Sequence, residues 1–255
     1  MTAALIGHTG FVGQNLASQG TFDARYNSRN IEQIRGKHYD LIVCAGAYAA
    51  KWKANQDPEA DALAIEKLTG PLGDVKAGRF VLISTVDVYS RPEMVDEDTP
   101  VDPLTATPYG RHRRELEAFC NTRFDACVLR LPALFGPGLK KNVIHDLLLD
   151  HQVENIHPDG VYQYYGLAHL WRDLNMALER GLKVLNLACE PIPTRELALR
   201  CFGRELSSYP SAAPALYDFR SKHAPLWGGQ PFGYLYSKER VLQEIRAFVE
   251  REQAL

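Results

Sequence analysis

The feature that most constrains the fold is an apolar segment at residues 3–6 that runs directly into three glycines, Gly7, Gly10 and Gly13, and then into a helical pattern. Glycines at this spacing permit a tight turn, a close approach of the backbone to a ligand and close packing of a helix against a strand. The first N–H groups of such a helix lack intrahelical partners and bind anions. The sequence therefore predicts a strand, a turn and a helix with an anion site between them.

Short apolar segments alternate with helical patterns along the rest of the chain. The apolar segments lie at residues 39–45, 79–84, 126–131 and 184–188, and the helical patterns cover residues 57–68, 109–121, 169–179 and 194–202. Strands that alternate with helices are typical of a parallel sheet covered on both faces. This pattern predicts an α/β fold with a doubly wound parallel sheet of the Rossmann type.

The pattern weakens after residue 135, which indicates a small C-terminal substrate-binding region. Residues 207–233 are rich in proline, glycine and aromatic residues without a clear period, and residues 237–251 form an amphipathic pattern that predicts a closing helix. We expect a dinucleotide-binding domain of residues 1–135 with a return segment at 162–203. Residues 136–161 and 204–255 would form the smaller region that binds the substrate.

Composition narrows the class of ligand. A formal net charge of −2 over 255 residues argues against nucleic acid or an anionic membrane as partner, and leaves a small molecule as the expected ligand. The chain contains no apolar stretch near the roughly 18 residues that span a bilayer and shows no leader pattern, so we expect a cytoplasmic protein. Its five cysteines form no CxxC pair and its histidines no HExxH motif, so neither a disulfide framework nor a metal site is expected.

We interpret the glycine turn as a site for the pyrophosphate of a dinucleotide, the alternative being a purely structural turn. An acid about twenty residues after the first glycine would bind the adenosine ribose of NAD. At that place Asn27, Ser28 and Arg29 include no acid, and Ser28 with Arg29 can bind a 2′-phosphate, which favours NADP over NAD. The residues of the turn predicted to contact the cofactor are Gly7, Thr9, Gly10, Phe11, Val12 and Gly13.

Three later motifs, in order and at plausible distances, resemble the extended short-chain dehydrogenase/reductase superfamily, and in particular its NAD-dependent epimerase/dehydratase branch, which acts on nucleotide sugars. They are Ser84-Thr85-Val86-Asp87-Val88-Tyr89, Tyr109-Gly110-Arg111-His112-Arg113 and the segment at 129–137 with the sequence LRLPALFGP. The glycine spacing is also similar to that of the superfamily. The resemblance covers most of residues 1–203, and the last fifty residues match only loosely.

The resemblance implies that Tyr109 is the general acid/base of a hydride transfer and that Thr85 hydrogen-bonds the reacting carbonyl or hydroxyl. Where the family has a lysine four residues after the tyrosine, this chain has Arg113, on the same helix face as Tyr109. A cation there would bind the ribose and lower the pKa of the phenol, although a planar guanidinium does not reproduce the geometry of an ammonium. Other cofactor contacts expected near the strand ends are Ala45, Gly46, Ser84, Leu131 and Pro132.

Four residues are candidate substrate contacts. Lys51 and Lys53 flank Trp52 where the family admits its substrate and can meet a negatively charged, ring-bearing molecule, although a solvated lysine pair explains them equally well. Asn142 follows a Gly-Pro-Gly turn where the branch holds a diphosphate. Asp87 matches one of the two carboxylates that the branch's dehydratases carry after the threonine. The other carboxylate is missing, which disfavours water elimination.

These predictions lead to an NADP-preferring oxidoreductase or epimerase that transfers hydride to or from a nucleotide-activated sugar or a similar polar keto or hydroxy compound. Arg113 keeps open a second hypothesis, a non-catalytic NAD(P)-binding sensor or scaffold with a degenerate Tyr-x-x-x-Arg site. A dehydratase with displaced acids is a third. The resemblance also implies a homodimer formed through the helices that carry the catalytic tyrosine.

Overall fold

The computed structural model describes residues 1–102, 106–228 and 231–254. Contacts within the chain divide it into two compact units. The first combines Met1–Ser90, Pro100–Arg130 and Ala168–Leu185, and the second combines Arg91–Thr99, Leu131–Leu167 and Asn186–Leu255. The predicted division into a nucleotide-binding domain and a substrate-binding region has other boundaries and stays a prediction.

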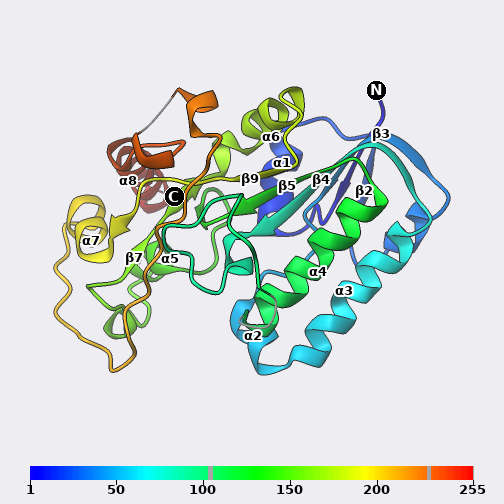
Figure 1. Ribbon diagram of the computed structural model, residues 1–255. Coiled ribbons are helices and arrows are strands. Elements are labelled where there is room, and N and C mark those ends of the chain that lie inside the picture. The colour runs from blue at the N-terminus through cyan, green and yellow to red at the C-terminus, as the bar shows by residue number, and fades with distance from the viewer. Residues whose placement is uncertain (103–105, 229–230, 255) are drawn as a thin grey trace. The chain divides into compact units, whose positions relative to one another are not determined.

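The first unit is built on a six-stranded sheet with the strand order β2-β1-β3-β4-β5-β9 (Figure 1). Its strands are β1 (Ala3–Ile6), β2 (Ala24–Tyr26), β3 (His38–Cys44), β4 (Lys76–Thr85), β5 (Ala126–Leu131) and β9 (Val184–Asn186). Strand β1 pairs in parallel with β2 on one side and with β3 on the other, and β3 pairs in parallel with β4. The strand order therefore reverses at β1. Ligands of open α/β sheets bind at the carboxyl ends of the strands at such a switch point.

Helices cover both faces of this sheet (Figure 1). The helices α1 (Phe11–Gln19) and α6 (Leu170–Glu179) lie side by side, and α3 (Pro58–Leu72) and α4 (Pro108–Arg123) lie side by side on the opposite face. Ile42 and Cys44 of β3 pack with Leu68 of α3 and Leu116 of α4, and the intervening Val43 is also fully buried. Burial on both faces explains the continuous apolar strands. The predicted doubly wound α/β fold is confirmed.

The described residues of the second unit form short strands and three α-helices. Its strands are β6 (Ala133–Phe135), paired in parallel with β8 (Tyr164–Gly166), and β7 (Val161–Tyr162), paired antiparallel with β10 (Ile192–Pro193). Its helices are α5 (Val143–Leu148), α7 (Thr194–Phe202) and α8 (Lys238–Gln253). Within the described part of residues 207–233, the only helical elements are the short 3-10 turns Ala224–Trp227 and Pro231–Gly233.

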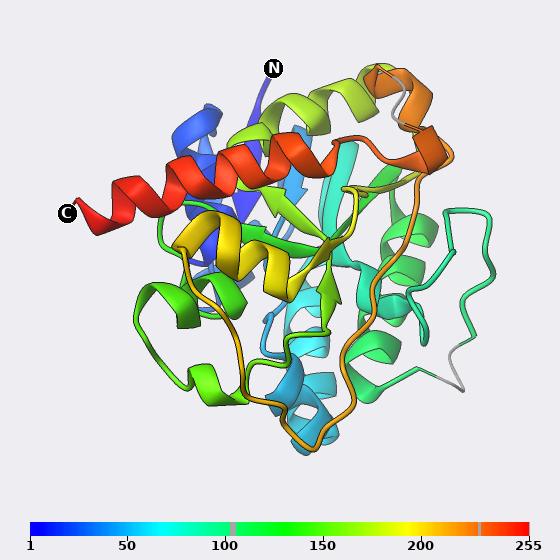
Figure 2. The same ribbon diagram turned by 90° about the vertical axis from the view of Figure 1, so that its left-hand side faces the viewer.

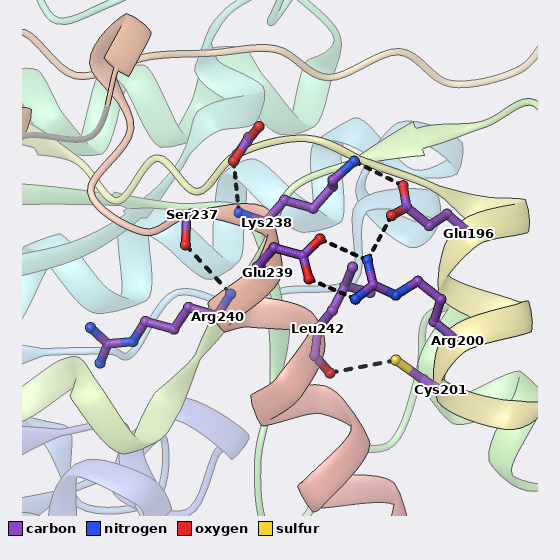
Figure 3. Close-up of polar contacts among 9 residues, drawn as sticks. Glu196, Arg200, Cys201, Ser237, Lys238, Glu239, Arg240 and Leu242 are labelled. Carbon is purple, nitrogen blue, oxygen red and sulfur yellow. Dashed lines mark hydrogen bonds and ion pairs between the residues drawn. The ribbon is translucent and has the colours of Figure 1, made fainter.

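The helices α7 and α8 pack against each other (Figure 2), and ion pairs join their exposed edges (Figure 3). Arg200 of α7 donates to both carboxylate oxygens of Glu239 of α8, at 2.8 and 2.6 Å, and Lys238 donates to Glu196 at 3.0 Å. The predicted closing helix therefore exists as α8 and is fixed to its neighbour. No helix among the described residues has the length and apolar character needed to cross a membrane.

Candidate active site

Strand β1 ends in the glycine turn, and the end of β3 lies against it. Gly7 has a φ of +83°, and a Cβ at this position would collide with the carbonyl group of Ala45, which is followed by Gly46. A Cβ at Gly13 would collide with the carbonyl oxygen of Gly7. The packing of the protein itself therefore requires glycine at positions 7 and 13.

Gly10 differs from the other two glycines of the turn. The nearest atom to a Cβ at this position would be the Gly7 carbonyl oxygen, at 3.4 Å, which is an ordinary contact. Thr9 and Gly10 are exposed, and α1 begins with Phe11 and Val12 without a side-chain cap. The first N–H groups of α1 thus meet no capping side chain, and a glycine without an internal steric reason is expected where the backbone approaches a ligand.

The segment predicted to select the cofactor lies beside the glycine turn. Tyr26, the last residue of β2, accepts a hydrogen bond of 2.8 Å from the Gly7 N–H. Asn27 then begins a tight turn in which its side-chain oxygen accepts from the Arg29 N–H at 2.9 Å, while its amide lies 3.2 Å from the His8 ring. Ser28 and Arg29 are exposed. Residues 27–30 contain no acid.

Helix α4 places Tyr109 at the end of β4. The helix begins with Pro108 after Thr107, whose side chain accepts from the Gly110 N–H at 3.3 Å. A Cβ at Gly110 would collide with the carbonyl oxygen of Asp87, so the first turn of α4 lies directly against the segment that follows β4. Tyr109 is 7% exposed there.

The phenol of Tyr109 stays protonated at neutral pH. Burial raises its pKa above the ordinary value, against the lowering effect of Arg113 and Lys51 and of a hydrogen bond with Thr85, and the carboxylate of Asp87 adds to the rise. The expected lowering of this pKa by a cation four residues later is present, but it does not bring the pKa below its ordinary value. Arg113 does lower it, but the cost of ionising a buried phenol is larger.

Lys51, at the start of α2 (Lys51–Gln56), reaches the same place from another element. Its Nζ donates to Asp87 Oδ1 at 2.7 Å. The backbone N–H of Asp87 donates to Thr85 Oγ1 at 3.1 Å, and that hydroxyl lies 3.5 Å from Asp87 Oδ2. Lys51, Asp87 and Thr85 thus form one polar group, and each of the three changes the pKa of Tyr109.

Arg113 is buried and held by several contacts. Its guanidinium donates to the carboxylate of Asp61 in α3 and to the carbonyl oxygen of Tyr48, and its central carbon lies 4.1 Å from the centroid of the Tyr109 ring. His112 Nδ1 lies 2.8 Å from the same Asp61 carboxylate. Burial disfavours the charged form of Asp61, but hydrogen bonds from Arg113 and His112 outweigh it and hold the pKa of Asp61 below its ordinary value.

These contacts engage both terminal nitrogens of Arg113. Its buried Nε has no hydrogen-bond partner among the residues that the structure describes. Arg113 therefore ties α4 to α3 and to the segment after β3.

Ser84 points away from this group into a buried network. Its hydroxyl donates to Glu117 Oε1 at 2.6 Å, and Arg130 donates to both oxygens of Glu117, at 2.9 and 2.7 Å. Arg130 also donates to the Tyr89 hydroxyl at 2.7 Å. Both charged side chains are at most 5% exposed. The network joins α4, β4 and β5 through one buried ion pair.

The structure gives the remaining predicted residues contacts of their own. Lys53 places its Nζ 5.3 Å from the ring centroid of Trp52, which is 63% exposed. Asn142 lies in the second unit, where its side chain caps α5 by accepting from the N–H groups of residues 144 and 145 and donates to the Leu134 carbonyl at 2.8 Å. Leu131 ends β5 and Pro132 follows it. Their predicted ligand contacts stay predictions.

Sequence reasoning missed Asp61. This carboxylate occupies a stripe position of α3 with Ile65, Leu68 and Leu72, all of them buried. A charged residue at an apolar stripe position needs a buried partner of opposite charge. The spacing is therefore a signal from which an ion pair could have been predicted, although it does not name Arg113 as the partner.

A parallel sheet with a glycine turn at its switch point and a buried tyrosine beside the end of β4 defines a Rossmann-type α/β protein. The model of the NAD dependent epimerase/dehydratase family matches residues 21–177, more than half of the sequence, so the chain belongs to this family. The match begins after the glycine turn. A search of the curated proteins found no match.

Solved structures show the same fold at low identity. An NAD-dependent NDP-hexosamine 5,6-dehydratase involved in tunicamycin biosynthesis is 16% identical, with a TM-score of 0.75 over 100% of this chain and 98% of its own. A dTDP-4-dehydrorhamnose reductase from Bacillus anthracis in complex with NADP is 17% identical, with a TM-score of 0.72 over 98% and 99%. A UDP-glucose 4-epimerase from Thermotoga maritima with UDP-glucose is 16% identical, with a TM-score of 0.71 over 100% of both chains.

Proposed function

We propose that the protein is an NADP-preferring oxidoreductase or epimerase that transfers hydride between the dinucleotide and a nucleotide-activated sugar or a similar polar keto or hydroxy compound. The observation that carries the proposal is the burial of Tyr109 beside Thr85, in the same unit as the glycine turn. Family membership and the nucleotide sugars named for the similar structures support the substrate class.

The residues present fit a dinucleotide. The uncapped first turn of α1 offers N–H groups to a pyrophosphate, and Gly10 leaves room for it. Exposed Ser28 and Arg29 would bind a 2′-phosphate, and the buried Nε of Arg113 would donate to a ribose hydroxyl. The dinucleotide, when bound, supplies or accepts the hydride.

Tyr109 would supply the proton. Its raised pKa keeps the proton on the phenol oxygen, and the hydrogen bond with Thr85 orients that oxygen. A protonated phenol donates to a carbonyl oxygen as negative charge develops there, so the site is better suited to carbonyl reduction than to alcohol oxidation. Asp87 bonds to Lys51 and stands without a second carboxylate directly beside it in sequence, which supports reduction over water elimination.

A second candidate function is binding without turnover. The observation in its favour is the engagement of both terminal nitrogens of Arg113 by Asp61 and Tyr48, since these contacts keep the guanidinium from acting as the family's lysine acts. Such a protein would bind NADPH without turnover and act as a sensor of the dinucleotide or as a scaffold.

The test is a fluorescence titration with NADPH and NADH, followed by a panel of nucleotide-linked keto sugars and measurement of the loss of reduced cofactor. We expect tighter binding of NADPH and its oxidation by at least one sugar. Tyr109→Phe should reduce turnover by about 100-fold or more and leave cofactor affinity nearly unchanged. Binding without oxidation across the panel supports the second candidate, and equal turnover in the variant contradicts the role of Tyr109.

A further inference from the structure

A histidine of the glycine turn contacts the segment that follows β2. The Gly7 N–H donates to the carbonyl oxygen of Tyr26 at 2.8 Å. One residue further along each segment the side chains meet, with His8 Nε2 3.2 Å from Asn27 Nδ2. Asn27 is followed in the chain by the exposed Ser28 and Arg29. The contact therefore lies next to the residues to which the 2′-phosphate of NADP is assigned above.

The hydrogen bonds of Asn27 determine which way its amide faces. Its Oδ1 accepts from the Arg29 N–H at 2.9 Å, so the group that faces His8 is the amide nitrogen, which donates. His8 Nε2 must then accept, and it can do so only in the neutral ring that carries its proton on Nδ1. Protonation of Nε2 would set two donors against each other and break the contact.

The elements around this pair carry basic side chains and no acid. The strand β1, the helix α1 and the last residues of β3 contain no charged residue, and the turn between β1 and α1 contains His8 alone. The segment of residues 24–31 adds Arg25 and Arg29, both exposed. Such surroundings favour an anion over a second cation.

The two acids that border this segment are engaged elsewhere. Asp23 accepts from the N–H of Ala3, the first residue of β1, at 2.7 Å, and the length of β1, about 13 Å, separates that end from the glycine turn. Glu32 accepts from Arg35 at 2.6 Å. A charge gained by the histidine is thus left for the anion of a ligand to pair with.

We propose that His8 is a proton-coupled ligand of the 2′-phosphate of NADP, which takes up a proton when the phosphate binds and so makes the preference for NADP over NAD stronger as the pH falls. His8 would donate to the phosphate together with the amide of Asn27 and the guanidinium of Arg29. The inference rests on the proposed function above, because it assigns His8 to the cofactor of that reaction.

The coupled step is the gain of one proton by the protein, and no covalent bond of the cofactor changes. A proton from solvent bonds to the lone pair of His8 Nε2, the hydrogen bond from Asn27 to that lone pair is lost, and both nitrogens then donate to phosphate oxygens. A phosphate monoester carries two negative charges above about pH 6 and stabilises the imidazolium. NAD has an uncharged hydroxyl at this position, so it should bind without proton uptake.

The first test counts protons by isothermal titration calorimetry of the full-length protein in two buffers that differ in ionisation enthalpy. A histidine with the ordinary pKa of about 6.5, whose titration midpoint rises by about one pH unit on binding, takes up about half a proton at about pH 7. We expect this uptake with NADP⁺ and almost none with NAD⁺. His8→Gln should abolish most of it, because glutamine can accept from Asn27 but does not titrate. His38→Gln, which replaces an exposed histidine at the first residue of β3, is the control and should leave the uptake unchanged.

The second test measures affinity against pH. The added stability of a protonated histidine in the complex is present at low pH and lost as the pH rises through the midpoint of the complex. The ratio of the Kd for NAD⁺ to the Kd for NADP⁺ should therefore rise about fourfold from about pH 8 to about pH 6.5. In His8→Gln this ratio should stay nearly constant over the same range.

The third measurement observes the histidine directly. The eight histidines are labelled with ¹⁵N in the ring, and the His8 signals are identified by their absence in His8→Gln. At about pH 7 they should show a proton on Nδ1 alone in the free protein, and on both nitrogens in most molecules of the NADP⁺ complex.

Equal proton uptake in His8→Gln and in the unsubstituted protein overturns the inference, as does a His8 ring that stays neutral in the complex. Proton-coupled binding of NADP⁺ without turnover of any nucleotide-linked sugar contradicts the proposed function and leaves the inference standing. Turnover with NADPH in a protein that takes up no proton contradicts the inference alone.

Discussion

Arg113→Lys would install the lysine that the family carries at this position, and we expect it to damage the protein. The guanidinium donates to Asp61 and to Tyr48 and stacks on Tyr109. The ammonium of a lysine ends a shorter side chain and can donate to only one of these two acceptors with good geometry. Loss of one hydrogen bond to a charged group costs about 1.5–3 kcal/mol, and loss of the stacking costs about 0.5–2 kcal/mol. The free energy of unfolding should therefore fall by about 2–5 kcal/mol.

Urea unfolding followed by the fluorescence of a single tryptophan measures this change. Trp171 lies in the first unit with its ring centroid 5.4 Å from that of Phe22, so a background of Trp52→Phe and Trp227→Phe confines the signal to that unit. Lys at position 113 should lower the midpoint of unfolding at an unchanged m-value. A free energy of unfolding within about 0.5 kcal/mol of that of the parent, or a kcat that rises with the lysine, would refute the structural role of Arg113.

Four further outcomes follow from the contacts described. Gly10→Val should weaken NADPH binding strongly in a titration while the thermal midpoint stays near that of the parent, because a Cβ there meets no atom closer than 3.4 Å. Arg29→Ala should raise the Kd for NADPH about tenfold and leave that for NADH unchanged; equal effects on both would contradict the preference for NADP. Arg130→Met should cost about 3–5 kcal/mol in urea unfolding, because buried Glu117 loses its two short bonds to Arg130 and keeps only the more distant Arg114, at 3.5 Å, as a cationic partner; adding Glu117→Gln should recover most of the loss. Because the pKa of Asp61 is held low in the folded state, its contribution is present at neutral pH and lost as the pH falls through that lowered pKa; acid unfolding of Asp61→Asn should show a smaller pH dependence below about pH 4.

The sheet was predictable because its central strands bury residues on both faces. Strand β3 holds four consecutive buried apolar residues, and such a run is visible in the sequence. Strand β2 was not predicted, because it is a three-residue segment in which Arg25 is exposed and only Tyr26 is buried. A short edge strand like this is specified by its pairing with β1 and leaves no apolar run.

The candidate site was predictable only where its residues are close in sequence. The spacing of Thr85, Tyr109 and Arg113 follows a family pattern, but the bond between Lys51 and Asp87 spans 36 residues and that between Arg113 and Asp61 spans 52. Pairs of this kind form because the fold brings separate segments together, and the sequence pattern does not name the partner, even where the stripe position of Asp61 indicates that one is needed. The sequence therefore predicts Tyr109 as the acid of the site but not the ion pairs of the charged groups that change its pKa.

The two halves of the site differ in how firmly the chain holds them. Tyr109 lies on a sixteen-residue helix with a side-chain cap and a buried ion pair to β5, whereas Lys51 begins a six-residue helix without such a cap and with Ala54 as its buried residue. Short uncapped helices open locally at a small free energy, so backbone amides of α2 should exchange with deuterium long before those of α4. Tyr109 would then keep its place when α2 opens, whereas the ion pair between Lys51 and Asp87 would break with each opening of that helix.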